Sequence, residues 1–188
     1  MNQKVELRQE LLQRRQLLPP PERAQAELAL DTLLTEWFAT TGQALQCIGA
    51  YWPIRGEPNL RPLLHKLVTT RTLVLPVSAA HQPLHFLRWT PDQPMQRDTY
   101  GITVPQGSVE AHPDCVLMPC LGFDRQGYRL GYGAGFYDRT LTSWAAENKP
   151  RPVVIGVSFA CGVIDTAFHQ PHDVPMDWCV TEQGMVKI

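Results

Sequence analysis

The 188-residue sequence has no long apolar run, no strong net charge and no close pair of cysteines, and each absence excludes a class of protein. No stretch reaches the roughly 18 apolar residues of a membrane-spanning helix, and the charged N-terminus lacks the apolar centre of a signal peptide. The 17 Lys and Arg residues are balanced by 18 Asp and Glu residues, whereas duplex-binding proteins are usually basic. We therefore expect a cytoplasmic protein that binds neither membranes nor nucleic acid.

The motifs of metal-dependent and covalent hydrolases are also missing. The five cysteines are odd in number and irregularly spaced, so we interpret them as reduced and mostly buried thiols. There is no HExxH zinc motif, and no Ser-His-Asp or Cys-His pattern stands out. Nucleophilic catalysis by a side chain is therefore not indicated.

What the sequence does contain is an alternation of helical and strand patterns. Helices are predicted over 3–18, 20–38, 60–68 and 136–147, and strands over 46–52, 72–75, 84–89, 114–118, 153–157 and 178–181. The stretch 90–106 has no clear period, and 122–135 is predicted to be an ordered, glycine-rich loop. The alternation predicts a single α/β domain over residues 1–188, with helices on both faces of a largely parallel sheet. Ligands of such folds bind at the carboxyl ends of the strands.

The strongest local signal is the segment from Arg129 to Arg139. Three glycines at alternate positions lead directly into a predicted helix: Gly131, Gly133 and Gly135. Glycines let backbone N–H groups approach a ligand, and a helix N-terminus favours anions, so the segment predicts a phosphate site flanked by two arginines. Phe136 replaces the third glycine of the dinucleotide fingerprint, and there is no P-loop lysine. The alternative is a tight loop in which the glycines serve only the backbone.

Carboxylates near this loop suggest a metal site. Asp138 falls in the first turn of the predicted helix, and Asp173 or Asp177 could supply a second carboxylate. Mg²⁺ typically takes one or two protein carboxylates, with phosphates and water completing its coordination. The alternatives are a favourable charge on the helix dipole for Asp138 and turn or capping roles for the other two.

Two further segments could face a ligand. Lys4 and Arg8 lie four residues apart on one helical stripe, with Arg15 on nearly the same bearing; the alternative is a solvated helix flank. The strand at 46–52 ends in two aromatics, Tyr51 and Trp52, followed by a turn and Glu57. The aromatics could stack on a heteroaromatic ligand, and Glu57 could bind it or move protons. Alternatively, these are a buried aromatic pair and a surface glutamate.

Together these groups indicate phosphoryl transfer by positioning and charge stabilisation, although they do not identify the acceptor. Taken in order along the chain, they resemble the 5-formyltetrahydrofolate cyclo-ligase family. The resemblance rests on Lys4-x-x-x-Arg8, residues 51–57, Leu75-Pro76, the block around Gly101 to Pro105, the Pro119–Asp138 block, and His172-Asp173 followed by Thr181-Glu182. The glycine-rich part of the Pro119–Asp138 block is its most specific portion.

The resemblance implies conversion of 5-formyltetrahydrofolate to 5,10-methenyltetrahydrofolate, with ATP and Mg²⁺ as cofactors and ADP and phosphate as products. It implies phosphorylation of the formyl oxygen and ring closure by N10. It also implies a three-layer α/β/α sandwich similar to the sugar-phosphate isomerase and CoA-transferase group. A monomer is expected.

Site roles are carried over by position. The resemblance makes Glu57 and Arg129 catalytic, and Asp138 and Asp173 the magnesium ligands. Trp52, Glu57 and Tyr100 would bind the folate. The ATP phosphates would be bound by Lys4, Arg8, Arg129, Leu130, Gly131, Tyr132, Gly133, Ala134, Gly135, Phe136 and Tyr137, of which Tyr132 to Phe136 would also face the folate.

Three positions depart from the pattern of the family. Gly162 stands where many relatives carry a glutamine, Ala134 where a glycine or a basic residue is usual, and Phe136 where a tyrosine is common. None of these changes removes a charge that the reaction needs. The alternatives are a folate- or nucleotide-binding protein of the same fold without activity, and a sugar-phosphate isomerase, which would need neither ATP nor a metal ligand at Asp138.

Overall fold

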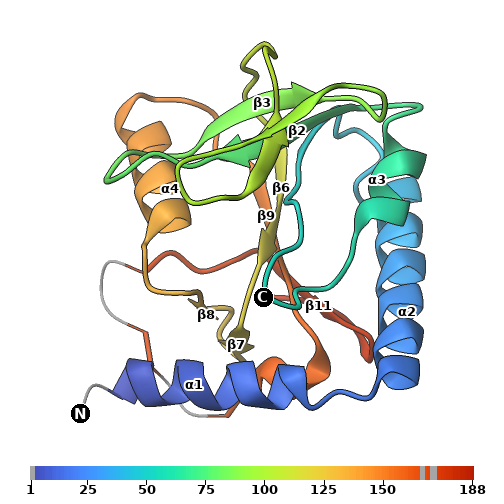
Figure 1. Cartoon of the computed structure of the whole chain (residues 1–188), viewed down its shortest axis with the longest axis vertical. Coiled ribbons are helices and arrows are strands. Elements are labelled where there is room, and N and C mark those ends of the chain that lie inside the picture. Colours follow the sequence, from blue (N-terminus) through green and yellow to red (C-terminus); the bar gives the residue numbers. More distant parts are fainter. Residues whose placement is uncertain (1–2, 166–167, 170–172) are drawn as a thin grey trace.

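A seven-stranded sheet forms the centre of the computed structural model, which describes residues 3–165, 168–169 and 173–188 (Figure 1). In sheet order the strands are β12 (Gly184–Lys187), β11 (Trp178–Thr181), β9 (Val153–Val157), β6 (Cys115–Pro119), β1 (Cys47–Gly49), β2 (Thr72–Val77) and β3 (His85–Trp89). The five inner strands pair in parallel, and only β3 and β12 at the edges are antiparallel. The predicted largely parallel sheet is confirmed.

Helices cover both faces of this sheet. Helices α2 (Pro20–Ala39) and α3 (Arg61–Leu67) pack on one face and α4 (Phe136–Ala146) on the other, while α1 (Gln3–Gln16) crosses one end (Figure 1). Pro20 opens α2, where a missing N–H group costs the helix nothing. The three-layer α/β/α arrangement is therefore as predicted.

The core consists of separate clusters on the two faces of the sheet, because successive side chains of the central strands point to opposite faces. Along β6, Cys115 and Leu117 face the cluster under α2 and α3, whereas Val116 and Met118 face the cluster under α4. Strands buried on both faces read as continuous apolar runs, which is why this segment could be recognised in the sequence. A third cluster joins Leu11 of α1 to the small sheet described next.

Several short strands were not predicted. A hairpin of β4 (Met95–Arg97) and β5 (Thr103–Pro105) occupies the stretch without a clear period. The supposed loop contains β7 (Gly122–Asp124) and β8 (Arg129–Leu130), which form a three-stranded sheet with β10 (Val163–Ile164). Strands of two or three residues are too short to show an alternating pattern. The edge strand β12, which follows the last predicted strand, is half exposed and was also missed.

Gly162 owes its identity to a close backbone contact. It ends the short 3₁₀ helix η1 (Ala160–Gly162), which lies against β7. A Cβ atom here would lie 2.6 Å from the carbonyl oxygen of Leu121, and one at Gly122 would collide with the carbonyl oxygen of Gly162. A glutamine at position 162, the residue that the resemblance to the family suggested, would therefore force η1 away from β7.

Two further expectations can be compared with the structure. All five cysteines are free, and Cys115, Cys120 and Cys179 are buried, in agreement with the sequence analysis. Across the described residues, the helices are too short or too polar to cross a membrane.

Candidate active site

A cavity of about 870 Å³ opens at the carboxyl ends of the central strands. Its wall includes Trp52 just after β1, Pro76 near the end of β2 and Pro119 at the end of β6. Parallel strands end at one edge of a sheet, so residues far apart in sequence meet there. Helix α1, the segment from β8 to α4, and Asp173 complete the cavity wall.

The glycine-rich segment forms the loop that enters α4. Gly133 and Gly135 have φ angles of 98° and 65°, a left-handed region that other residues adopt only with strain. The Nε of Arg8 donates a hydrogen bond of 2.8 Å to the carbonyl oxygen of Gly131. A Cβ atom on Gly133 would lie only 3.3 Å from the Arg8 guanidinium carbon. The glycines thus let the loop turn into the helix while α1 packs closely over it.

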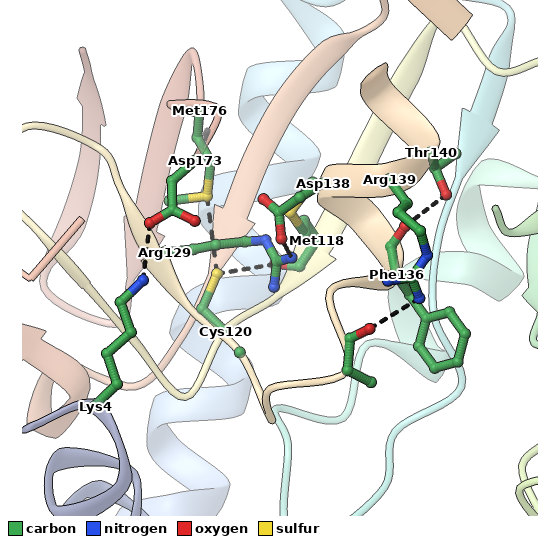
Figure 2. Close-up of polar contacts among 12 residues, drawn as sticks. Lys4, Met118, Cys120, Arg129, Phe136, Asp138, Arg139, Thr140, Asp173 and Met176 are labelled. Atoms are coloured by element: carbon green, nitrogen blue, oxygen red, sulfur yellow. Dashed lines mark hydrogen bonds and ion pairs between the residues drawn. The ribbon is translucent and has the colours of Figure 1, made fainter. Parts of the chain in front are cut away.

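Two ion pairs line the same cavity (Figure 2). Arg129 Nη2 lies 2.7 Å from an Asp138 carboxylate oxygen, and Lys4 Nζ lies 2.9 Å from one of Asp173. The Arg129 side chain is only 9% exposed. Cations and carboxylates therefore alternate along one wall, where low exposure strengthens their interactions with a charged ligand.

The guanidinium groups have donors to spare. Within the described part of the chain, the Nε atoms of Arg129 and Arg139 are buried without a hydrogen-bond partner. Arg139 Nη2 donates a 2.8 Å hydrogen bond to the carbonyl oxygen of Ala134 (Figure 2). Buried donors of this kind usually have a partner. The second flanking arginine of the motif thus places a cation beside the backbone of Ala134.

The carboxylates suit a metal that is shared with a ligand. Asp138 and Asp173 both line the cavity, but the described residues include no group of three or more His, Cys, Asp or Glu side chains able to hold a metal alone. Two carboxylates fit Mg²⁺, which draws its other ligands from phosphate and water. Asp177 lies elsewhere: its carboxylate accepts hydrogen bonds from Arg151 and from the backbone N–H of Val154.

The same cavity is lined by Glu57, a buried carboxylate, and by the aromatic side chains of Tyr51 and Trp52. Glu57 is 4% exposed, and the backbone N–H of Ile54 donates a 2.9 Å hydrogen bond to its Oε2. Burial raises the pKa of Glu57 to about 7, against the lowering effects of this hydrogen bond and of nearby cations. Trp52 packs edge-on against Trp89, with ring centroids 6.0 Å apart. The alternative interpretation of Glu57 as a surface glutamate is thus wrong, because Glu57 is a buried group that can exchange a proton near neutral pH.

The structure brings nearly all predicted site residues together. Lys4, Arg8, Trp52, Glu57, Asp173 and the whole run from Arg129 to Asp138 line the cavity. Tyr100 does not line it. Its ring is about half exposed and packs edge-on against Phe136. Tyr100 lies in the turn between β4 and β5, where its backbone N–H donates a hydrogen bond to the Asp98 carboxylate. Its role in folate binding stays a prediction.

Arg15, which the sequence placed on nearly the same bearing as Lys4 and Arg8, is not among the residues that line the cavity. It is 1% exposed, and its Nη1 donates a 3.0 Å hydrogen bond to the hydroxyl of the loop residue Tyr132. Its burial could have been inferred from the sequence, because Arg15 stands between Leu11 and Leu18 on the apolar stripe of α1. A charged residue on an apolar stripe must have buried partners.

Comparison with known proteins identifies the family. The sequence profile described as the 5-formyltetrahydrofolate cyclo-ligase family matches residues 1–182. The chain belongs to this family. Among curated cyclo-ligases, the protein of Mycolicibacterium smegmatis is 34% identical over 98% of this chain and 97% of its own length. The cyclo-ligase of Haemophilus influenzae is 33% identical, covering 69% of this chain and 72% of its own.

Solved structures agree with the cyclo-ligase fold. A 5,10-methenyltetrahydrofolate synthetase from Aquifex aeolicus superimposes with a TM-score of 0.80 at 26% identity, covering 98% of this chain and 92% of that one. The synthetase of Mycoplasma pneumoniae gives 0.75 at 24% identity, over 96% and 99% of the two chains, which supports the fold alone.

Proposed function

We propose that this member of the cyclo-ligase family converts 5-formyltetrahydrofolate to 5,10-methenyltetrahydrofolate, using ATP and Mg²⁺ and releasing ADP and phosphate. One observation carries the proposal: a single cavity joins a cationic, glycine-rich loop at a helix N-terminus to an aromatic wall with a buried carboxylate. The first end suits phosphates and the second suits a pterin ring.

The substrate explains why a nucleotide is needed. An N-formyl group is an amide-like carbonyl whose oxygen is a poor leaving group. When bound, ATP supplies a phosphoryl group for that oxygen, and Mg²⁺ neutralises phosphate charge. N10 then attacks the formyl carbon, the N10 proton is lost, and the C–O bond breaks with departure of phosphate. The protein must hold the two substrates in line and neutralise developing charge.

The cations of the cavity are placed for the phosphate end. Arg129 is the group we assign to the transferred phosphoryl, because it is nearly buried and has an unpartnered buried Nε donor among the described residues. The N–H groups of the loop, together with Lys4 and Arg8, would bind the other phosphate oxygens. Asp138 and Asp173, which both line the cavity, would hold Mg²⁺.

Glu57 is placed for the folate end. As a carboxylate it would accept the N10 proton when the ring closes, and a pKa of about 7 suits a base that works near neutral pH. Activity should therefore rise with pH up to about 7, as the carboxylate forms. We further propose that the protein acts as a monomer.

The test is a spectroscopic assay for the conjugated methenyl product. Purified protein is mixed with 5-formyltetrahydrofolate, ATP and Mg²⁺, with ATP and Mg²⁺ omitted in turn. We expect the chromophore to form only in the complete mixture, with one ADP released per product. Folate binding without product or ADP release would overturn the proposal in favour of a binding protein.

Lys4→Ala should raise the KM for ATP by about tenfold and leave kcat nearly unchanged. The lysine would bind phosphate equally in the ground and transition states, and losing uniform binding affects KM alone. The KM for ATP is measured at saturating folate. Lys149→Ala, which removes an exposed lysine paired with Glu147, is the matched control. An unchanged KM for ATP would contradict a phosphate-binding role for Lys4 and would favour the alternative, in which this stripe of α1 is a solvated helix flank.

A further inference from the structure

Glu57 is coupled to helix α1 through Arg15 and Tyr132. Arg15 Nη1 donates a 3.0 Å hydrogen bond to the hydroxyl of Tyr132. Arg15 and Tyr132 both lower the pKa of the neighbouring Glu57 carboxyl group, against the effect of its burial. Arg15 Nη2 also donates to the carbonyl oxygen of Cys120, at the end of β6. Arg15 is therefore held by two hydrogen bonds, and the hydroxyl that accepts one of them belongs to a residue that also acts on Glu57.

From this geometry we propose that Arg15 is a positioning residue for catalysis, which orients the Glu57 carboxylate and stabilises its charge through Tyr132. The inference rests on the proposed function of Glu57 as the proton acceptor. Tyr132, the first residue between the loop glycines, would then act on Glu57 in addition to binding phosphate. The positioning role of Arg15 also explains a fully buried arginine on the apolar face of α1.

Burial makes Arg15 the more effective of two cations near Glu57. Among the described residues, six side chains from the surrounding elements interact electrostatically with the Glu57 carboxyl group: Arg15, Tyr51, Arg55, Cys120, Tyr132 and Tyr137. Burial raises the pKa of the tyrosines well above their usual range and that of Cys120 to about 12, so these groups stay neutral through pH 9. Arg55 is exposed, and solvent and salt screen its charge.

The sign of the effect follows directly. A nearby cation favours the carboxylate and lowers its pKa, typically by about 1–3 units for a close, buried partner. Removing Arg15 should therefore raise the pKa of Glu57. The enzyme would then need a higher pH before the carboxylate forms, and activity lost at low pH would return at high pH.

The experiment compares the pH dependence of kcat/KM for the folate in wild-type protein, Arg15→Gln and Tyr132→Phe. We expect the acidic limb to move up by about one pH unit in both variants. At pH 6.5 this is roughly a tenfold loss, and at pH 9 the loss should shrink to about threefold or less. The double variant should shift no further than either single variant, because the groups act in series. Arg14→Gln, which removes the exposed neighbouring arginine, should leave the limb in place.

A merely structural role for Arg15 would give a different result. It would lower kcat/KM by the same factor at every pH, and the acidic limbs of Arg15→Gln and Tyr132→Phe would coincide with wild type; this outcome overturns the proposal. Tyr132→Phe keeps the aromatic ring and the Arg15–Cys120 contact, so it decides the question even where Arg15→Gln fails to fold.

A second readout separates this inference from the proposed function. The carboxyl carbon of Glu57 is followed by NMR in protein labelled with ¹³C-glutamate, with Glu57→Gln identifying the signal. An upward shift of the Glu57 pKa in both variants is expected whether or not the protein turns over. Wild-type protein without turnover would contradict the proposed function, whereas an unshifted titration would contradict the role of Arg15.

Discussion

Asp138→Asn should lower kcat by about 10²- to 10³-fold while the protein stays folded. Asn keeps the shape of the side chain but removes one of the two carboxylates that we assign to Mg²⁺. Losing a preorganised group that acts on developing charge typically costs this much. The Asp138 side chain is a quarter exposed, so its replacement opens no cavity in the core. The measurement is kcat at saturating ATP and folate over a series of Mg²⁺ concentrations.

The Mg²⁺ dependence makes this result specific. Asp138→Asn should need a higher Mg²⁺ concentration for half-maximal rate. Asp177→Asn is the matched control. The sequence suggested Asp177 as a second metal ligand, but in the structure its carboxylate forms an ion pair with Arg151. The Mg²⁺ dependence of Asp177→Asn should equal that of wild type. Wild-type turnover by Asp138→Asn at limiting Mg²⁺ would contradict the metal assignment.

Arg129→Lys should lower kcat by about 10³-fold although the charge is kept. An arginine that stabilises a transferring phosphoryl group contributes about 10³–10⁵ to the rate, and a lysine lacks its planar set of donors. The geometry of Arg129 depends on that plane: one Nη atom contacts Asp138, and the guanidinium lies 5.3 Å from the centre of the Tyr137 ring. We expect kcat to fall more than the KM for ATP rises.

The comparison with Lys4→Ala tests the division of labour in the cavity. Both residues are cations of the phosphate end, yet one should change kcat and the other KM. Circular dichroism and urea unfolding would show whether Arg129→Lys, which alters a nearly buried ion pair, still folds. A folded Arg129→Lys that keeps kcat within threefold of wild type would remove Arg129 from the transferred phosphoryl group.

The sequence predicted those parts of the fold whose physical cause is local. The apolar runs at 115–119 and 153–157 were found to within one residue, since strands buried on both faces are apolar throughout. The predicted strand 46–52 is shorter in the structure, where β1 ends at Gly49 and the next residues turn toward the cavity. The two small sheets could not be predicted, because their strands gain their partners only in the folded chain.

The same distinction applies to the site. The glycine-rich loop and its helix are contiguous, so their chemistry was visible in the residues themselves. The burial of Glu57 was not visible, because it depends on α1 and on the loop that carries Tyr132, which are distant in sequence. The pairing of Lys4 with Asp173 joins residues 169 positions apart. Such contacts arise from topology and have no signature in the sequence.

That pairing has a consequence for how the protein is made. Helix α1 is synthesised before its partners, because Leu11 packs in one cluster with Leu121, Leu130 and Ile164, which follow much later in the chain. Contacts of such high sequence separation form late and slowly. During synthesis α1 therefore exposes its apolar stripe and Arg15 to solvent until the segments carrying Leu121, Leu130 and Ile164 have been made. The cavity that α1 helps to form is not complete before that point.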